Sequence, residues 1–457
     1  MKIAVLNGSP SGDSSVTLFT LRYIQLFYPG HDIDILHVGQ QIRKMEREPE
    51  CWKSMLAEAD LILFCYPVYT FLAPAQLHKF IALMKRSGLD FSQKYASQIT
   101  TSKHFYDTTA HRYIRDNCAD LGLRFVNGLS ADMDDLLTEE GREEAVLWFR
   151  RLLWSMEHGY YEHSEMPAMD FSPVIADSAE PAELAGNGTV AIVADYGADD
   201  TKQSLDAMIS RFRSRLPYKT EVVDLQAFPF AGGCLGCFRC AADGKCVYKD
   251  GFDDYLREHI QTADAIVYAF PIRDHSMGCL MKTYDDRQFC NGHRTVTMGK
   301  PVAYLISGPL AREENVRTLI ESRAQVGGNH LAGVATDERE PNAEIDQLAA
   351  SLTFDLQNGY REPKNFYGVG GLKIFRDLIY QMRGLMRADH KFYKSNGFYD
   401  FPQKRKGRIF GMYAVGALMN NENLRRKAGG KINEGMCMPY QKVLDRAQEK
   451  LNSERSK

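Results

Sequence analysis

Long apolar runs are missing from this sequence of 457 residues. The longest apolar stretches, such as residues 61–66 and 409–419, are too short to span a bilayer as helices. Residues 1–8 begin a strand-like segment at once and show no signal-peptide pattern. We therefore expect a cytoplasmic protein without a transmembrane segment.

Arrangements typical of hydrolases and simple metal sites are also missing. No Ser-His-Asp arrangement and no pair of carboxylates at an informative spacing stands out, and the twelve histidines are dispersed. The formal net charge of −3 says nothing about partners on its own. We expect no nucleic-acid partner. With 44% apolar and 25% charged residues, the chain has the composition of an ordinary globular protein.

The ten cysteines are not expected to form a disulfide framework, because cytosolic thiols stay reduced. Six of them are scattered along the chain: Cys51, Cys65, Cys118, Cys279, Cys290 and Cys437. The other four fall within thirteen residues, at Cys234, Cys237, Cys240 and Cys246. This crowding is the feature that requires an explanation.

The order of apolar segments in the first half of the chain recurs in the second half. Residues 59–68 and 263–272 match almost position for position, since both read Ala-Asp, six mostly apolar residues, and a Pro followed by Val or Ile. Residues 126–132 and 331–337 form a second such pair, and both end on Asp. A duplicated unit is the simplest explanation, and the ordered recurrence argues against one large α/β domain.

Strand-like and helix-like segments alternate within each half, which predicts parallel βαβ units and a doubly wound sheet. The strand candidates are short and continuously apolar, as expected for sheets covered on both faces. The predicted organisation is an α/β protein with domains at residues 1–163 and 189–355, a linker at 164–188, and a helical extension at 356–457.

The predicted extension is basic and rich in aromatic residues. From Lys373 to Lys457 there are nineteen Lys and Arg against eight Asp and Glu. Such a tail could contact a dinucleotide phosphate, an acidic partner, a membrane surface or the rest of the chain. Seven aromatic residues between positions 375 and 401 favour packing within the molecule.

The loop after the first strand candidate, residues 7–17, consists mainly of Gly, Ser, Asp and Thr. A loop of this kind between a strand and a helix can direct N–H and hydroxyl groups at a phosphate. It is neither a Gly-Lys-Ser/Thr phosphate loop nor a Gly-x-Gly-x-x-Gly fingerprint. An ordinary helix N-terminus would use similar residues, so the pattern alone leaves both readings open.

Three segments together resemble the flavodoxin-like NAD(P)H-dependent FMN reductases. Residues 7–10, Asn-Gly-Ser-Pro, with Ser15-Val16-Thr17, resemble the FMN phosphate loop, while residues 66–69 and 100–102 resemble the loops on either side of the flavin ring. Their strand ends should converge on one crevice. The resemblance implies two tandem flavodoxin-like doubly wound sheets, FMN as cofactor and NAD(P)H as cosubstrate. The cofactor-binding residues it implies are Ser9, Ser11, Ser15, Thr17, Pro67, Val68, Tyr69, Thr101 and Ser102.

One of these positions departs from the family pattern, because Ser11 stands where the reductases often carry a basic residue. The resemblance identifies no catalytic residue. His104-Phe105-Tyr106-Asp107 follow the third segment and are expected at the rim of the site.

The clustered cysteines have the spacing C-x2-C-x2-C-x5-C. Thiolates so close in sequence suit one compact iron–sulfur centre, whereas structural zinc sites usually pair two CxxC knuckles across a longer gap. The spacing differs from the bacterial ferredoxin run but resembles the motif of the iron–sulfur flavoproteins, a branch of the same flavodoxin-like group. That resemblance implies a [4Fe–4S] cluster on Cys234, Cys237, Cys240 and Cys246, with zinc or free thiols as alternatives.

The two halves differ in a way that suggests a division of labour. The first turn of the second half carries Asp195, Asp199 and Asp200, which would repel a phosphate. We therefore expect FMN in the first domain and the cluster in the second. The expected function is an NAD(P)H-dependent flavin oxidoreductase that passes electrons between FMN and the cluster to an unidentified acceptor.

The sequence leaves two other functions open. One is a clusterless FMN or quinone reductase, and the other is a non-catalytic electron carrier that docks a redox partner. The expected partners are a small-molecule electron donor or acceptor or a redox protein, and a homo-oligomer stays open.

Overall fold

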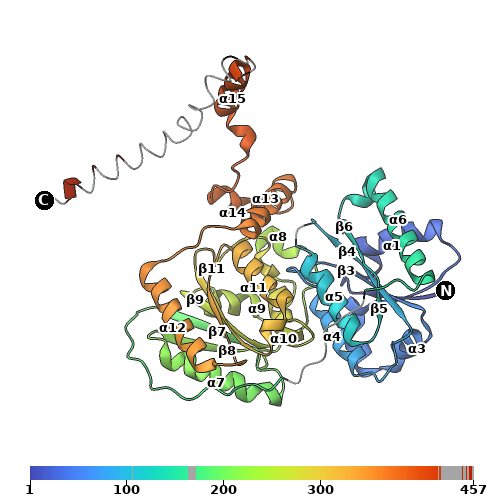
Figure 1. The fold of residues 1–457 in the computed structure, drawn as a ribbon, viewed down its shortest axis with the longest axis horizontal. Helices are drawn as coiled ribbons and strands as arrows, with labels where there is room; N and C mark the ends of the chain where they lie inside the picture. The colour runs from blue at the N-terminus through green and yellow to red at the C-terminus, as the bar shows by residue number, and fades with distance from the viewer. Residues whose placement is uncertain are drawn as a thin grey trace. The chain divides into compact units, whose positions relative to one another are not determined.

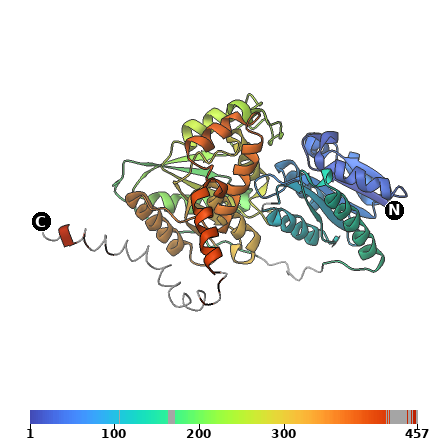
Figure 2. The ribbon, with the colours of Figure 1, turned by 90° about the horizontal axis from the view of Figure 1, so that it is seen from above.

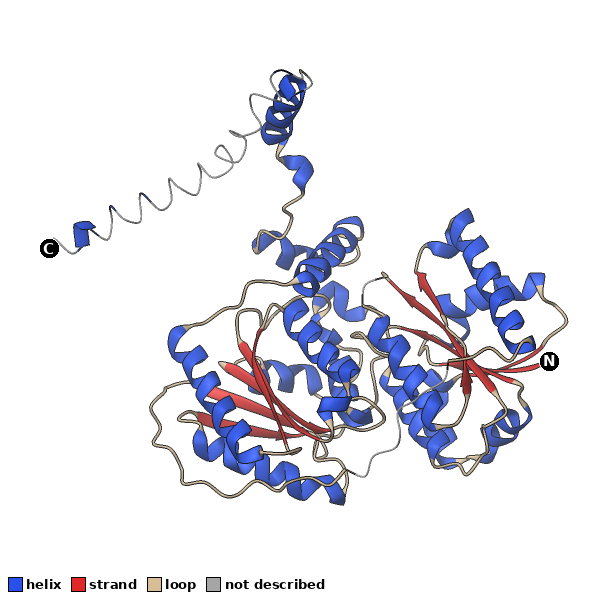
Figure 3. Cartoon of the chain, in the orientation of Figure 1, coloured by secondary structure: helices blue, strands red, loops and turns tan. Residues whose placement is uncertain are grey.

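The computed structural model describes residues 1–104, 106–162, 171–419, 421, 423, 445, 449 and 452–454. The chain divides into two compact units, residues 1–396 and residues 397–457. The first unit contains two separate sheets, which Figure 3 shows in red, and each belongs to one half of the repeat.

All strands of the first sheet are parallel, and their spatial order is β2-β1-β3-β4-β5, with β6 also paired to β4. The strands are β1 (Lys2–Asn7), β2 (Asp32–Leu36), β3 (Leu61–Pro67), β4 (Tyr95–Ser102), β5 (Arg124–Phe125) and β6 (Leu129–Asp132). The helices are α1 (Val16–Phe27), α2 (Val38–Arg47), α3 (Glu50–Glu58), α4 (Ala75–Lys85), α5 (Thr108–Asp120) and α6 (Glu139–Glu157).

The second sheet repeats this order, since β11-β10-β9-β7-β8 is the same path counted within its own half. Its strands are β7 (Thr189–Ala194), β8 (Lys219–Asp224), β9 (Ala265–Pro271), β10 (Pro301–Ser307) and β11 (His330–Thr336). Its helices are α7 (Asp199–Arg215), α8 (Arg239–Asp243), α9 (Phe252–Tyr255), α10 (Gly278–Arg287), α11 (Glu314–Gly327) and α12 (Pro341–Asn358). This is the flavodoxin-like strand order 2-1-3-4-5, and it confirms the predicted tandem α/β fold.

Helices cover both faces of each sheet (Figures 1 and 2), which explains why the central strands are apolar without alternation. In β3 the six residues from Leu61 to Tyr66 are all buried, and every residue of β10 is buried. One apolar cluster continues through both halves, and two smaller clusters fill the outer layers. The halves therefore share a core.

The same tight turn follows the third strand of each half. Residues 69–72 and 273–276 each close an isolated antiparallel bridge with two backbone hydrogen bonds of 2.8–3.0 Å. Both central residues of each turn have positive φ: 44° and 71° at Thr70 and Phe71, and 52° and 58° at Asp274 and His275. Such backbone is costly for residues with a side chain, so its recurrence supports a common origin of the halves.

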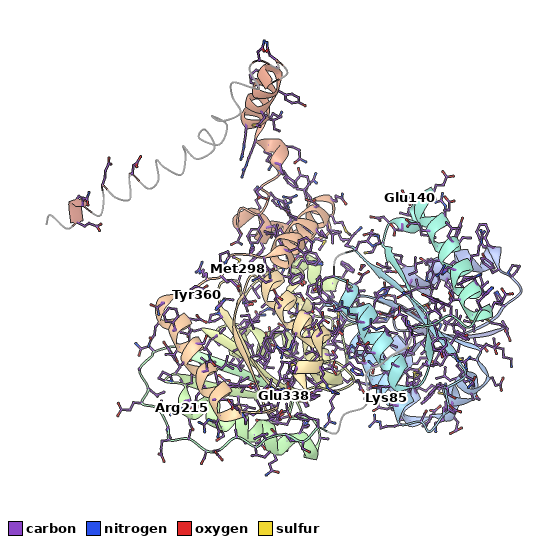
Figure 4. The ribbon with its side chains drawn as sticks, viewed as in Figure 1. Lys85, Glu140, Arg215, Met298, Glu338 and Tyr360 are labelled. Carbon is purple, nitrogen blue, oxygen red and sulfur yellow. The ribbon has the colours of Figure 1, made fainter. Side chains whose placement is uncertain are left out.

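These turns lie where the halves meet, because α4 and α5 of the first half pack against α10 and α11 of the second. The turn of the second half binds the first half: Lys85 (labelled in Figure 4) pairs with Asp274 at 3.0 Å and with Asp120 at 2.5 Å. Equivalent elements thus contact each other in both directions, as in the isologous interface of a two-fold dimer.

After α12 the chain forms α13 (Phe366–Gln381) and α14 (Arg387–Ser395), which pack against α11 and α8. Tyr393 of α14 is buried, and its hydroxyl donates to the carbonyl of His293 at 3.3 Å. The second unit contains α15 (Lys406–Met419). Within the described part of the chain, no helix is both long and apolar enough to cross a membrane.

His275 should contribute a pH-dependent link between the halves. It hydrogen-bonds Asp120 at 3.0 Å and Glu313 at 2.9 Å. Burial opposes its charge, but these two carboxylates outweigh burial and raise the pKa of His275 to about 10. The stabilisation is complete below the unfolded-state pKa of about 6.5 and is lost as pH rises through 10.

We expect His275→Gln to lower the free energy of unfolding by about 1–3 kcal/mol at pH 6.5 and by much less at pH 10.5, measured by urea denaturation. His259→Gln is the matched control, because His259 pairs with Glu221 at 3.0 Å on an exposed surface, where about 0–1 kcal/mol is typical. An equal loss at both pH values would contradict this assignment.

Candidate active site

The Gly/Ser loop of the first half is fixed by Asn7 at the end of β1. The Asn7 side chain accepts from the Ser9 N–H at 3.1 Å and donates to the Gly12 carbonyl at 3.0 Å. A close approach of α2 also constrains the loop, because a Cβ at Gly39 would lie 2.4 Å from the Ser9 backbone. The loop then leads into α1, whose first turn carries no acidic residue. This helix end therefore keeps its positive partial charge.

Hydroxyl groups converge beside this helix end. Ser9, Ser15, Thr17 and Thr101 are buried, and the Thr17 and Thr101 hydroxyls lie 2.8 Å apart. Thr101 comes from the end of β4, two strands away from the loop in the sheet. Buried hydroxyls and free helix N–H groups at strand ends are what a phosphate monoester needs.

A cavity of about 490 Å³ opens at these strand ends. It is lined by every residue that the sequence predicted for the cofactor: Ser9, Ser11, Ser15, Thr17, Pro67, Val68, Tyr69, Thr101 and Ser102. Its size is typical of a site for a small organic ligand. His104 lies near it, with its ring 3.1 Å from Asp135, whereas Phe105 lies outside the described residues.

The four clustered cysteines of the second half line the same cavity. Positive φ angles at Gly236, Phe238 and Gly244 curl their loop. Cys234 accepts from the Gly236 N–H at 3.4 Å, and the Cys240 thiol donates to the Phe289 carbonyl at 2.9 Å.

Burial, with smaller contributions from Asp286, Cys240 and Cys237, raises the pKa of the Cys234 thiol to about 12, although the Gly236 N–H opposes the shift. Burial also raises the pKa of Cys240 to about 11, with contributions from Cys237 and Cys246. The thiols are therefore close enough to influence one another's charge. As arranged, however, the described residues contain no group of three or more His, Cys, Asp or Glu side chains positioned to hold a metal ion.

Arg287 anchors the cysteine loop, although no sequence motif marks this residue. Its buried guanidinium pairs with both carboxylate oxygens of Asp250 at 2.7 and 2.8 Å and donates to the Gly232 carbonyl at 3.0 Å. Its guanidinium also lies 4.4 Å from the ring centre of Tyr248 and 5.1 Å from that of Phe252. These contacts hold both ends of the loop against α10.

Cys290 is a second residue that sequence analysis missed, because it was one of the scattered cysteines. It follows α10, is buried, and lines the cavity beside the cysteine loop. Burial raises its pKa to about 12, and Cys246 and Cys240 add to this effect. Only the folded chain brings this fifth thiol to the other four.

Residues of the second half also hold the turn at residues 69–72, which begins with Tyr69. The Lys282 ammonium donates to the Tyr69 carbonyl at 2.9 Å and to the Thr70 hydroxyl at 2.8 Å. The Asp286 carboxylate accepts from the Ala75 N–H at 2.8 Å and forms a buried ion pair with Lys282. Burial raises the pKa of Asp286 to about 6, although Lys282 opposes the shift. One wall of the cavity therefore depends on both halves.

In the second half, carboxylates lie at the strand ends that correspond to the Gly/Ser loop of the first half. Asp195 accepts from the N–H groups of Gly197 at 3.0 Å and Met281 at 3.3 Å. Asp337 is fully buried and accepts from the Ser204 hydroxyl at 2.6 Å and the Gly308 N–H at 2.9 Å. The Gly197 N–H, the Ser204 hydroxyl and the Gly308 N–H are therefore already used as donors within the protein. The side chains of Asp199 and Asp200 lie outside the described residues.

The family model of NADPH-dependent FMN reductase matches residues 1–132 and 192–334, which together make up more than half of the chain. The chain belongs to this family. The two matched segments correspond to the two halves, so the predicted family and tandem duplication are confirmed. As an NADPH-dependent FMN reductase family member, the chain is a flavin oxidoreductase.

Curated relatives of this family member include two iron–sulfur flavoproteins. One from Archaeoglobus fulgidus is 28% identical over 176 residues, which cover 36% of this chain and 79% of that protein. Another from Clostridioides difficile is 25% identical over 100 residues, covering 22% of this chain and 44% of that protein.

Similar solved structures each align with about one third of this FMN reductase family chain. An NAD(P)H:quinone oxidoreductase from Methanothermobacter marburgensis is 16% identical, with a TM-score of 0.28. The aligned region covers 36% of this chain and 99% of that protein. An FMN-dependent NADH-azoreductase from Bacillus anthracis is 13% identical, with a TM-score of 0.27. The aligned region covers 33% of this chain and 99% of that protein.

Removing the loop anchor of this FMN reductase family member should lower its stability. We expect Arg287→Leu to lower the free energy of unfolding by about 3–5 kcal/mol, because it leaves the largely covered Asp250 carboxylate without its charged partner, with only the N–H groups of Ala231 and Phe252 donating to it. Urea denaturation of Arg287→Leu, Asp250→Leu and the double variant measures the coupling between them. The double variant should lose less than the sum of the single variants, and simple additivity would contradict the anchor role.

Proposed function

We propose that the chain is an NAD(P)H-dependent oxidoreductase that binds one FMN in its first half and an iron–sulfur centre, of the [4Fe–4S] type, on the cysteine loop of its second half. Electrons from NAD(P)H would pass through these groups to an acceptor that is a small molecule or a redox protein. The observation that carries the proposal is the single cavity lined both by the nine predicted cofactor residues and by the four clustered cysteines.

The residues of the first half fit FMN by their chemistry. Ser9, Ser11, Ser15 and Thr17 would hold the phosphate at the N-terminus of α1, where hydroxyl and N–H donors meet the helix dipole. Pro67, Val68, Tyr69, Thr101 and Ser102 would line the flavin ring. A bound flavin can accept a hydride and release electrons one at a time, which would link a nicotinamide to a one-electron centre.

The buried carboxylates of the second half support a single FMN per chain. Asp195 and Asp337 already accept from the N–H and hydroxyl groups nearest to the phosphate position of that half. An incoming phosphate, with its charge close to −2, would meet two carboxylates instead of free donors. The second half would therefore serve the reaction through its cysteines.

Soft thiolate donors at Cys234, Cys237, Cys240 and Cys246 would suit iron–sulfur ligation. Their placement on one cavity wall supports a shared centre, although the loop would have to draw its thiols together around the metal. The relatives from Archaeoglobus and Clostridioides carry the name iron–sulfur flavoprotein, which adds support from similarity. We propose the domain boundaries 1–163, 189–355 and 356–457 for this division of roles.

Flavin titration tests the location and number of the FMN. We expect one FMN per chain and a 10- to 100-fold weaker Kd in Thr17→Ala, because a hydrogen bond to a charged group is worth about 1.5–3 kcal/mol. Ser204→Ala is the matched control, since Ser204 bonds Asp337 at 2.6 Å within the protein. Two FMN per chain, or an equal effect of Ser204→Ala, would overturn the assignment.

The cysteine centre is tested by anaerobic reconstitution with iron and sulfide, followed by absorption and EPR spectra. Cys237→Ser combined with Cys240→Ser should lose the iron and its EPR signal but retain FMN. Cys51→Ser with Cys118→Ser is the matched control, because neither of these residues lines the cavity. Iron retained after loss of Cys237 and Cys240 would overturn the assignment of the centre to the cysteine loop, and an unmodified chain that takes up no iron would favour the clusterless reductase.

A further inference from the structure

The turn at residues 69–72 of the first half touches the backbone of the cysteine loop at a crowded point. Gly236 lies between Cys234 and Cys237, with a φ of +58°, and a Cβ placed on it would lie 2.0 Å from the Tyr69 hydroxyl. The next nearest atom of Tyr69 would be 3.2 Å away, so the hydroxyl causes the crowding. The Tyr69 hydroxyl therefore occupies the space where a side chain at Gly236 would begin.

Both sides of this contact belong to the sites described above. Tyr69 lines the cavity, and its own carbonyl is held by Lys282 at 2.9 Å. On the other side, the Gly236 N–H donates to the Cys234 thiol at 3.4 Å. A neighbouring hydrogen bond also joins the first half to the cysteine loop, since Gln76 of α4 donates to the Cys234 carbonyl at 3.3 Å. A change in the shape of the cysteine loop must therefore move Gly236 against Tyr69.

We propose that the Tyr69–Gly236 contact couples the two sites, so that loading of the cysteine centre tightens FMN binding and FMN tightens retention of the metal. This regulation rests on the proposed function. A metal that draws the thiols together fixes the backbone between Cys234 and Cys237, and Gly236 then holds the Tyr69 ring in position for the flavin. Because the coupling is a free energy shared by both ligands, it acts equally in both directions.

The experiment compares FMN affinity in the full-length chain with and without reconstituted iron and sulfide. Quenching of FMN fluorescence gives both Kd values for each protein. We expect iron loading to tighten FMN binding about tenfold in the unmodified chain, within the usual range of coupling between sites. In Gly236→Ala the ratio should fall towards one, because the added methyl group displaces the Tyr69 hydroxyl.

Two further variants separate the contact from backbone strain. Tyr69→Phe removes the clashing hydroxyl, so the Gly236→Ala, Tyr69→Phe double variant should recover most of the coupling. Gly251→Ala is the matched control, because Gly251 also has a positive φ, +75°, but nothing within 4 Å of its added Cβ. It should keep the tenfold ratio.

Iron release to a chelator, followed by absorbance, provides an independent readout. FMN should slow this release in the unmodified chain and in Gly251→Ala, but not in Gly236→Ala. If the unmodified chain binds both iron and FMN fully but its FMN Kd is the same with and without iron, the coupling alone would be overturned. Failure to retain iron would overturn both the proposed centre and the coupling, and failure to bind FMN would overturn the flavin site.

Discussion

The packing of α4 and α5 on α10 and α11 is the constraint on which the rest of the first unit depends. At its centre the buried Lys282 ammonium binds Asp286, the Tyr69 carbonyl and the Thr70 hydroxyl. A buried ammonium is tolerated only when partners replace its water, and here those partners come from both halves. The interface therefore shapes the turn at residues 69–72 and places the cysteine loop beside it.

Much of this arrangement follows from the sequence because it is local. The short apolar strands, the Gly/Ser loop at residues 7–17 and the matching segments at 59–68 and 263–272 predicted two doubly wound sheets, and the strand ends predicted one crevice. All nine predicted cofactor residues line one cavity for that reason. Their roles in binding FMN remain a prediction.

The features that the sequence did not reveal depend on distant partners. Arg287 reads as an ordinary residue near the end of α10 until Asp250 and the Gly232 carbonyl meet it. Cys290 joins the other thiols because the short turn after α10 contacts α8 of the cysteine loop. The contact of Tyr69 with Gly236 spans the two halves, and no periodicity in either half encodes it. Such pairings arise from tertiary packing and leave no local signature.

The isologous contact between the halves has a consequence for how they could diverge. In a dimer of identical chains, every substitution appears at both sites, so an aspartate that closes one phosphate pocket closes both. Here the two sites are encoded separately, and Asp337 can fill one pocket while Ser9 and Thr17 leave the other available. The peptide connection also keeps each half beside its partner at any dilution, because their association is intramolecular. Fusion thus permits specialisation without the risk of losing the partner.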